Sequence, residues 1–148
     1  MGARRKAREL VLQMLYQHDM SGNAPDMIVD TFDDLQKSKP NTRDFATKIF
    51  RGTVDNLSEI DGMIQAQADN WRLSRMAVVD RNIIRMSIYE FLHEDDTPKL
   101  VIIDEAIEIA KKYGTAKSSQ FINGILDGIL KRYNLDSDDG RKQKAEKS

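Results

Sequence analysis

Hydrophobic residues recur at three- and four-residue spacing along most of the chain, a pattern that predicts amphipathic helices. In the first of these, over about residues 3–20, the apolar stripe consists of Ala7, Leu10, Val11, Met14, Leu15 and His18. Further helices are predicted over about residues 26–37, 42–55, 58–71, 75–93, 101–113 and 117–133. Because no alternating run of β-branched residues marks a strand, we expect an all-α fold of about seven helices.

The turns between these helices carry the usual helix breakers. Gly22 and Pro25 separate the first two helices. Ser58 begins the segment "SEID", which resembles a capping box, and Gly114 is expected to end the sixth helix in the left-handed conformation. The helix at 75–93 is apolar over a wide arc, which favours a central position packed on more than one side.

Composition narrows the classes of function. Charged residues make up 32% and hydrophobic residues 40% of the 148 residues, a balance typical of globular domains. The formal net charge is −1, so a nucleic-acid site must come from local clustering of cations. The absence of cysteine excludes disulfides, thiolate nucleophiles and cysteine–zinc sites. That absence suits a reducing cytosol, so we expect a cytoplasmic protein. No apolar run approaches the ~20 residues that span a bilayer.

Four cations fall in the first two turns of the first helix: Arg4, Arg5, Lys6 and Arg8. The amino end of a helix carries partial positive charge, so the backbone disfavours them there. Successive helical residues are ~100° apart, which places Tyr16 on the same flank as the three arginines. Arginine binds phosphate and an aromatic ring stacks on bases, so this flank can form a surface for single-stranded RNA. The alternative is an ordinary solvated surface on which Glu9 screens the cations.

Phe121, in the last helix, points about 100° away from the apolar stripe of that helix. Gly124 and Gly128 lie on its side and leave room for a close approach. Either the ring contacts a base or a protein partner, or it fills a second core while the glycines admit a neighbouring helix; the spacing favours neither. Polar side chains that can read base edges are Gln13, Ser118, Ser119 and Gln120.

Arg81, Arg85 and Tyr89 form a row at four-residue spacing, beside Asp80. Such a row serves either intramolecular pairing or a partner surface. Trp71, farther back along the chain, is interpreted as a plug between helices.

No constellation for catalysis or metal binding stands out. His18 and His93 have no second ligand at metal-binding spacing. The sequence also lacks a glycine-rich phosphate loop and a nucleophile elbow. We therefore predict no catalytic residue, no metal and no cofactor.

Four segments together resemble the NusB family of bacterial transcription antitermination factors: "ARRKARELVLQMLYQ", "VVDRNIIRMSIYEF", "IDEAIEIAKKYG" and "FINGILDGIL". Their order and spacing also match, up to about Tyr133. The resemblance implies one compact domain over 1–134, made of two small helical bundles at about 1–72 and 73–134. It implies a noncatalytic factor that binds boxA RNA of ribosomal RNA leader transcripts, pairs with NusE and joins an RNA polymerase antitermination complex. The polar residues 135–148 are predicted to form a disordered tail.

The resemblance also implies roles for individual residues. The arginine-rich opening of the family corresponds to Arg4, Arg5, Lys6 and Arg8, and the aromatic residue of the same helix corresponds to Tyr16. The phenylalanine of "FINGILD" corresponds to Phe121 and is expected to meet RNA. Asp80 corresponds to an acid that is a candidate contact for NusE, a small-subunit ribosomal protein. Lys117 departs from a well-known family member, which has an acid there, and is expected to add to the phosphate surface instead.

Our hypothesis is an RNA-binding adaptor without catalysis. The candidate RNA-binding residues are Arg4, Arg5, Lys6, Arg8, Gln13, Tyr16, Lys117, Ser118, Gln120 and Phe121. The candidate partner-binding residues are Asp80, Arg85 and Tyr89, and apolar surface that would receive NusE can instead support a homodimer. One alternative is an adaptor whose partner alone contacts RNA. Another is an enzyme, since NusB-like domains also occur fused to RNA methyltransferases; it is disfavoured because no room is expected for a methyl-donor domain.

Overall fold

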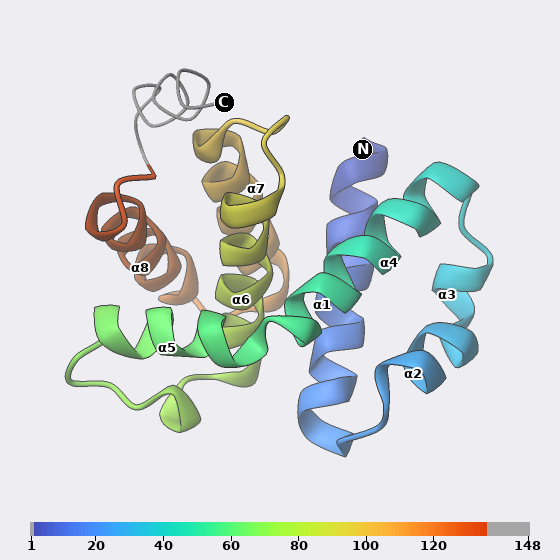
Figure 1. The fold of residues 1–148 in the computed structure, drawn as a ribbon, viewed down its shortest axis with the longest axis horizontal. Helices are drawn as coiled ribbons and strands as arrows, with labels where there is room; N and C mark the ends of the chain where they lie inside the picture. Colours follow the sequence, from blue (N-terminus) through green and yellow to red (C-terminus); the bar gives the residue numbers. More distant parts are fainter. Residues whose placement is uncertain (1, 136–148) are drawn as a thin grey trace.

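The computed structural model describes residues 2–135, and over that range it contains eight α-helices, one 3₁₀ helix and no strand. The elements are α1 (Ala3–Ser21), α2 (Pro25–Thr31), α3 (Asp33–Gln36), α4 (Pro40–Asp55), α5 (Leu57–Gln67), η1 (Leu73–Arg75), α6 (Val78–His93), α7 (Lys99–Tyr113) and α8 (Ser118–Arg132). The all-α prediction is confirmed (Figure 1). Apart from Leu135, the tail predicted over 135–148 lies outside the described residues.

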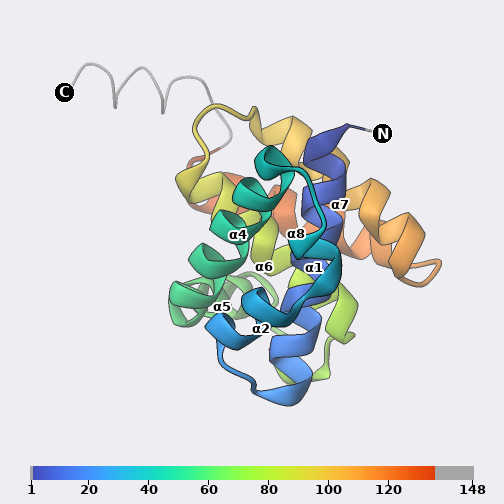
Figure 2. The same cartoon turned by 90° about the vertical axis from the view of Figure 1, so that its right-hand side faces the viewer.

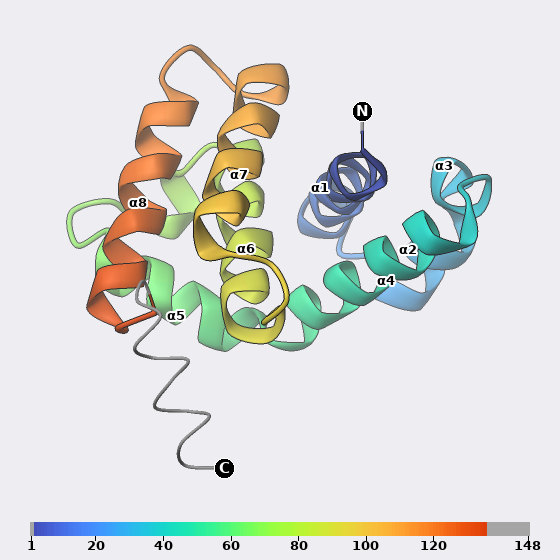
Figure 3. The same ribbon diagram turned by 90° about the horizontal axis from the view of Figure 1, so that it is seen from above.

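α6 is the central element of the described chain. It contacts α1, α4, α5, α7 and α8. Figures 1 and 3 show it between α1 and α4 on one side and α8 on the other. Every residue from Asn82 to Phe91 is buried, because a helix enclosed on several sides has no solvated face. The predicted central position is confirmed.

The helices on the two sides of α6 form an N-terminal and a C-terminal group. α1 packs chiefly on α4, with α2 and α3 beside them, whereas α7 packs on α6 and α8. α5 lies against α6 and α8 more than against α4, so it joins the C-terminal group. The predicted boundary near residue 72 stays a prediction, but the packing of α5 favours a boundary near Asn56.

The apolar stripe of α1 faces the core as predicted. The buried members are Ala7, Leu10, Val11, Met14 and Leu15. His18 is half-buried; its ring meets the Phe50 ring edge-on, with centroids 6.5 Å apart. The His18 Nδ1 atom lies 3.0 Å from the carbonyl oxygen of Asn23. These contacts give His18 a structural role.

Several helix starts differ from the predicted ones. The segment 26–37 forms two helices because Phe32 is extended, with φ −80° and ψ 101°, and packs its side chain on the core. α4 begins at Pro40, whose fixed φ suits the first helical position. Ser58 already lies inside α5 and makes no capping hydrogen bond, so the predicted capping box is wrong.

Two further predictions, for Trp71 and for Gly114, are also wrong. α5 stops at Gln67, and Trp71 in the following loop is 54% exposed instead of plugging a gap between helices. Gly114 has φ −96° and ψ −167°, which is not left-handed. A Cβ atom at Gly114 would lie 2.5 Å from Ser118 Oγ and 2.8 Å from the Ala110 carbonyl oxygen. Gly114 is therefore needed for space at the turn and not for its φ.

Candidate nucleic-acid interface

Arg5 bridges α1 and α7. Its Nε and Nη2 atoms donate to the two carboxylate oxygens of Glu105 at 2.7 and 2.8 Å. These hydrogen bonds raise the pKa of Arg5 and lower the pKa of the Glu105 carboxyl group. The Arg5 side chain is still 31% exposed, so a phosphate group that reaches it competes with Glu105.

Arg8 is buried, a position that does not fit the phosphate contact expected of it. Its Nε and Nη2 atoms donate to Glu90 of α6 at 2.9 and 2.8 Å, and both side chains are at most 5% exposed. Burial alone would lower the pKa of Arg8, but the hydrogen bonds and the charge of Glu90 leave it raised. Arg8 therefore holds α1 on α6.

The remaining cations of the first two turns, Arg4 and Lys6, are exposed. The Arg4 guanidinium lies over the ring of Phe45 in α4, 3.8 Å from its centroid, as a cation–π contact. Farther along α1, Gln13 is half-buried and Tyr16 is 44% exposed. The outer face of α1 thus keeps cations, an amide and an aromatic ring.

Glu9 joins this face of α1 to the end of α7. It is 6% exposed, and its Oε1 atom accepts hydrogen bonds from Lys112 Nζ at 2.5 Å and from the Tyr113 hydroxyl at 2.7 Å. Burial would raise the pKa of Glu9, but these two hydrogen bonds leave it lowered. From the sequence, Glu9 was expected only to screen the nearby cations. Its partners lie 103 and 104 residues away, so local spacing could not reveal them.

The first turn of α8 holds the other predicted RNA contacts. Lys117 and Gln120 are exposed. Ser118 is buried, and its Oγ atom accepts the Thr115 N–H at 2.9 Å, so it caps the turn and is not placed to read a base edge. Phe121 is half-buried and packs partly against the core.

The surroundings of Gly124 and Gly128 in α8 bear on whether Phe121 meets a ligand or fills a second core. A Cβ atom at Gly128 would collide with the side chain of Gln67 from α5, so this glycine admits a neighbouring helix. Nothing lies within 4 Å of a Cβ atom at Gly124, which leaves open surface beside the ring. Phe121 therefore contributes to the core and also borders solvent.

The contacts of Glu9 bring the two predicted segments to one region. Tyr113, which binds Glu9, is the last residue of α7, and four residues separate it from the start of α8 at Ser118. Figure 2 shows the turn between α7 and α8 projecting to one side of α1. The outer face of α1 and the first turn of α8 therefore flank the end of α7.

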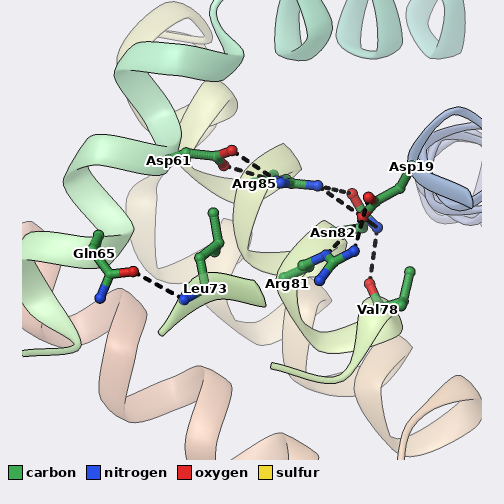
Figure 4. Close-up of polar contacts among 8 residues, drawn as sticks. All are labelled: Asp19, Asp61, Gln65, Leu73, Val78, Arg81, Asn82 and Arg85. Carbon is green, nitrogen blue, oxygen red and sulfur yellow. Dashed lines mark hydrogen bonds and ion pairs between the residues drawn. The ribbon is translucent and has the colours of Figure 1, made fainter. Parts of the chain in front are cut away.

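The polar row on α6 is an internal ion-pair network (Figure 4). Arg81 donates to both carboxylate oxygens of Asp19, at 2.7 and 2.8 Å. Arg85 bridges Asp19, at 2.9 Å, and Asp61, at 2.8 and 2.9 Å. Burial would raise the pKa of Asp19, but hydrogen bonds from Arg81 and Asn82 leave it lowered. Intramolecular pairing, one of the two open interpretations, describes this row.

The three candidate partner contacts lie mostly in the interior. Asp80, Arg85 and Tyr89 are 9%, 7% and 8% exposed. Tyr89 stacks on His93, with ring centroids 4.7 Å apart. Asp80 differs from the other two, because its Oδ1 atom is buried and lacks a hydrogen-bond partner within the described residues.

No group of three or more His, Cys, Asp or Glu side chains between residues 2 and 135 is arranged to hold a metal ion. None of the helices in that range has the length and apolar character needed to cross a membrane.

Comparisons with known proteins agree on one family. The NusB family model matches residues 5–131. The chain is 48% identical over 130 residues to the transcription antitermination protein NusB of Geobacter sulfurreducens, which covers 87% of this chain and 94% of that protein. It is 43% identical over 145 residues to the protein of the same name from Koribacter versatilis, with 97% of each covered.

Solved structures show the same fold. T. maritima NusB is 40% identical, with a TM-score of 0.79 over 86% of this chain and 90% of that one. A structure of the antitermination factors NusB and NusE in complex with dsRNA gives a TM-score of 0.80 over 88% and 98% of the two chains. At 24% identity, the second similarity is one of fold.

Proposed function

Because the chain belongs to the NusB family, we propose that it is a noncatalytic, RNA-binding transcription antitermination factor. Its ligand is boxA RNA of ribosomal RNA leader transcripts, and its protein partner is NusE. The pair joins an RNA polymerase antitermination complex in the cytoplasm.

One observation carries the proposal: cations and an aromatic ring share the outer face of α1 beside the end of α7. Arg5, Lys6, Gln13 and Tyr16 lie within about 100° of one another around the helix. Glu9, on the same face, reaches the end of α7 through Lys112 and Tyr113. An unpaired RNA strand needs such a combination, because cations hold its phosphates and flat rings stack on its bases.

The exposure of each side chain decides its proposed role. Phosphate contacts are assigned to the cations that reach solvent: Arg4, Arg5, Lys6 and Lys117. Base contacts are assigned to two rings and two amides: Tyr16, Phe121, Gln13 and Gln120. The buried Arg8 and Ser118 hold the helices that present these groups. NusE is assigned to α6, with Asp80 at its start as the proposed contact, and the buried Arg85 and Tyr89 hold that helix in place from inside.

A binding titration tests the proposal. Labelled boxA RNA is titrated with the chain alone and with its NusE complex, each as wild type and with Arg5 and Lys6 changed to alanine. We expect the wild-type chain to bind RNA, more tightly with NusE, and the double variant to bind more weakly. No binding by the chain alone, together with no effect of the variant in the complex, would assign RNA contact to NusE alone.

A further inference from the structure

We propose that a hollow between α1, α3 and the end of α7 is a subsite for one ribonucleotide whose base carries an exocyclic amine. The inference rests on the proposed RNA-binding function and deepens it. The hollow measures about 490 Å³, and its charged and amide lining consists of Lys6, Glu9, Gln13, Asp34, Lys37 and Lys112. Four of these, Glu9, Asp34, Lys37 and Lys112, lie outside the RNA contacts assigned above.

Glu9, which lines the hollow, carries a buried acceptor. The Oε1 atom of Glu9 accepts hydrogen bonds from Lys112 and Tyr113, but its Oε2 atom is buried without a partner among residues 2–135. A buried carboxylate oxygen that lacks a donor is unfavourable. A ligand that brings an N–H or O–H group to this oxygen removes that penalty.

The hollow has a net positive lining, because three lysines outnumber the two acids Glu9 and Asp34. Lys6 is exposed, and Lys37, just after α3, has a side chain that is 73% exposed. Lys37 pairs with Asp33 at 2.8 Å, and such an exposed pair contributes so little that a phosphate group can replace the carboxylate. Lys112 binds Glu9 while its side chain is 55% exposed, so its ammonium can turn outward to a phosphate and uncover the carboxylate.

The buried Glu9 acceptor and the exposed lysines of the hollow together determine which class of ligand can bind. A phosphate dianion or a carboxylate side chain presents only acceptors, and the charge of Glu9 repels it. A ribonucleotide presents phosphate to the lysines and an amine to Glu9. Adenine, cytosine and guanine carry that amine. Uracil offers only its ring N3–H, and the carbonyl oxygens on both sides of that donor are repelled by the Glu9 carboxylate, so we expect the subsite to disfavour uridine.

The role of the lysines is tested with Lys37→Ala, and Lys131→Ala serves as a matched control. Each lysine is exposed and pairs with an aspartate four residues earlier, but Lys131 lies near the end of α8. The measurement uses labelled boxA RNA and the NusE complex. We expect the fall of log affinity with log salt to be less steep for Lys37→Ala, by about 0.7 in the slope. Lys131→Ala should leave that slope unchanged. If the two variants behave alike, the proposal is overturned.

The Glu9 acceptor is tested from the RNA side. Bases of boxA are replaced one at a time by analogues without the amine: inosine for guanosine, purine riboside for adenosine and uridine for cytidine. One position should lose about tenfold in affinity for the wild-type complex. The loss should shrink for Glu9→Gln, because a neutral amide accepts hydrogen bonds less strongly than a carboxylate. The same losses in the two proteins at every position would refute the subsite.

Failure of the subsite and failure of the proposed function give different results. RNA binding that depends on Arg5 and Lys6 but not on Glu9 or Lys37 would remove the subsite and leave the function standing. No binding of boxA RNA by the wild-type chain alone, together with no effect of the Arg5 and Lys6 changes in the NusE complex, would remove both. Thermal unfolding checks that Glu9→Gln is folded, and if it is not, the comparison of Lys37→Ala with Lys131→Ala decides alone.

Discussion

At the scale of single residues, the Arg8–Glu90 pair is the most deeply buried charge pair of α1. Removing one member leaves the other charge buried and unpaired, which costs about 3–5 kcal/mol. Arg8→Ala should therefore lower the free energy of unfolding in urea by about that amount. Lys6→Ala, at an exposed position in the same helix, should change it by less than ~0.5 kcal/mol. Similar effects of the two variants would contradict the structural role of Arg8.

Phe121 borders both the core and solvent, so its removal should have two effects. Phe121→Ala should weaken boxA RNA binding by about 1–3 kcal/mol if the ring stacks on a base, and it should also lower the melting temperature. Ile125→Ala is the control, because Ile125 is likewise half-buried against the core one turn along α8. We expect that control to lower the melting temperature only. A lower melting temperature with unchanged affinity for Phe121→Ala would assign the ring to the core.

Helical spacing predicted which residues of α1 face the core, because the angle between successive residues is fixed. It did not predict that Arg8 turns inward, since Glu90 lies 82 residues away in the sequence. Ser118 illustrates a second limit: a hydroxyl can read a base or cap a turn, and only the backbone around Thr115 decides. Local pattern thus predicts the face on which a side chain lies, and tertiary contacts decide what it binds.

At the scale of elements, Arg85 ties three helices together: α6 to α1 through Asp19 and α6 to α5 through Asp61 (Figure 4). Arg85→Ala would leave both carboxylates short of a partner, and we expect a loss of about 3 kcal/mol in the free energy of unfolding. Arg81→Ala should cost less, about 1 kcal/mol, because Arg85 still pairs with Asp19. Urea unfolding of both variants checks the order, and equal losses would contradict the bridging role of Arg85.

The helices themselves were predictable because their apolar stripes are long and regular. The wide apolar face of α6 also indicated its central position. Their ends were less predictable. The break at Phe32 follows from packing of that ring on the core, and the extended Gly114 follows from crowding by Ser118 and Ala110. Both are decided by neighbours in space, which a single helix does not reveal.

At the scale of the whole molecule, carboxylates join α1 to the central helix α6 and to α7 of the C-terminal group: Glu9 to α7, Asp19 to α6, and Glu105 of α7 to Arg5. Folding lowers the pKa of all three from usual values of 4.5 for Glu and 3.8 for Asp. A group whose pKa is lower in the folded state stabilises it above the unfolded-state pKa, and that contribution is lost as pH falls through the folded-state value.

The free energy of unfolding should therefore change little between about pH 7 and pH 5 and fall below about pH 4. Urea unfolding at a series of pH values measures this acid limb. Glu105→Gln should make the limb shallower, because glutamine, unlike Glu105, has no carboxylate that takes up a proton when the protein unfolds in acid. Equal slopes for the wild type and this variant would contradict a contribution of the Arg5–Glu105 contact to the union of the two groups. A shallower limb would show that Arg5, which is proposed to bind phosphate, also holds α1 on α7 through Glu105.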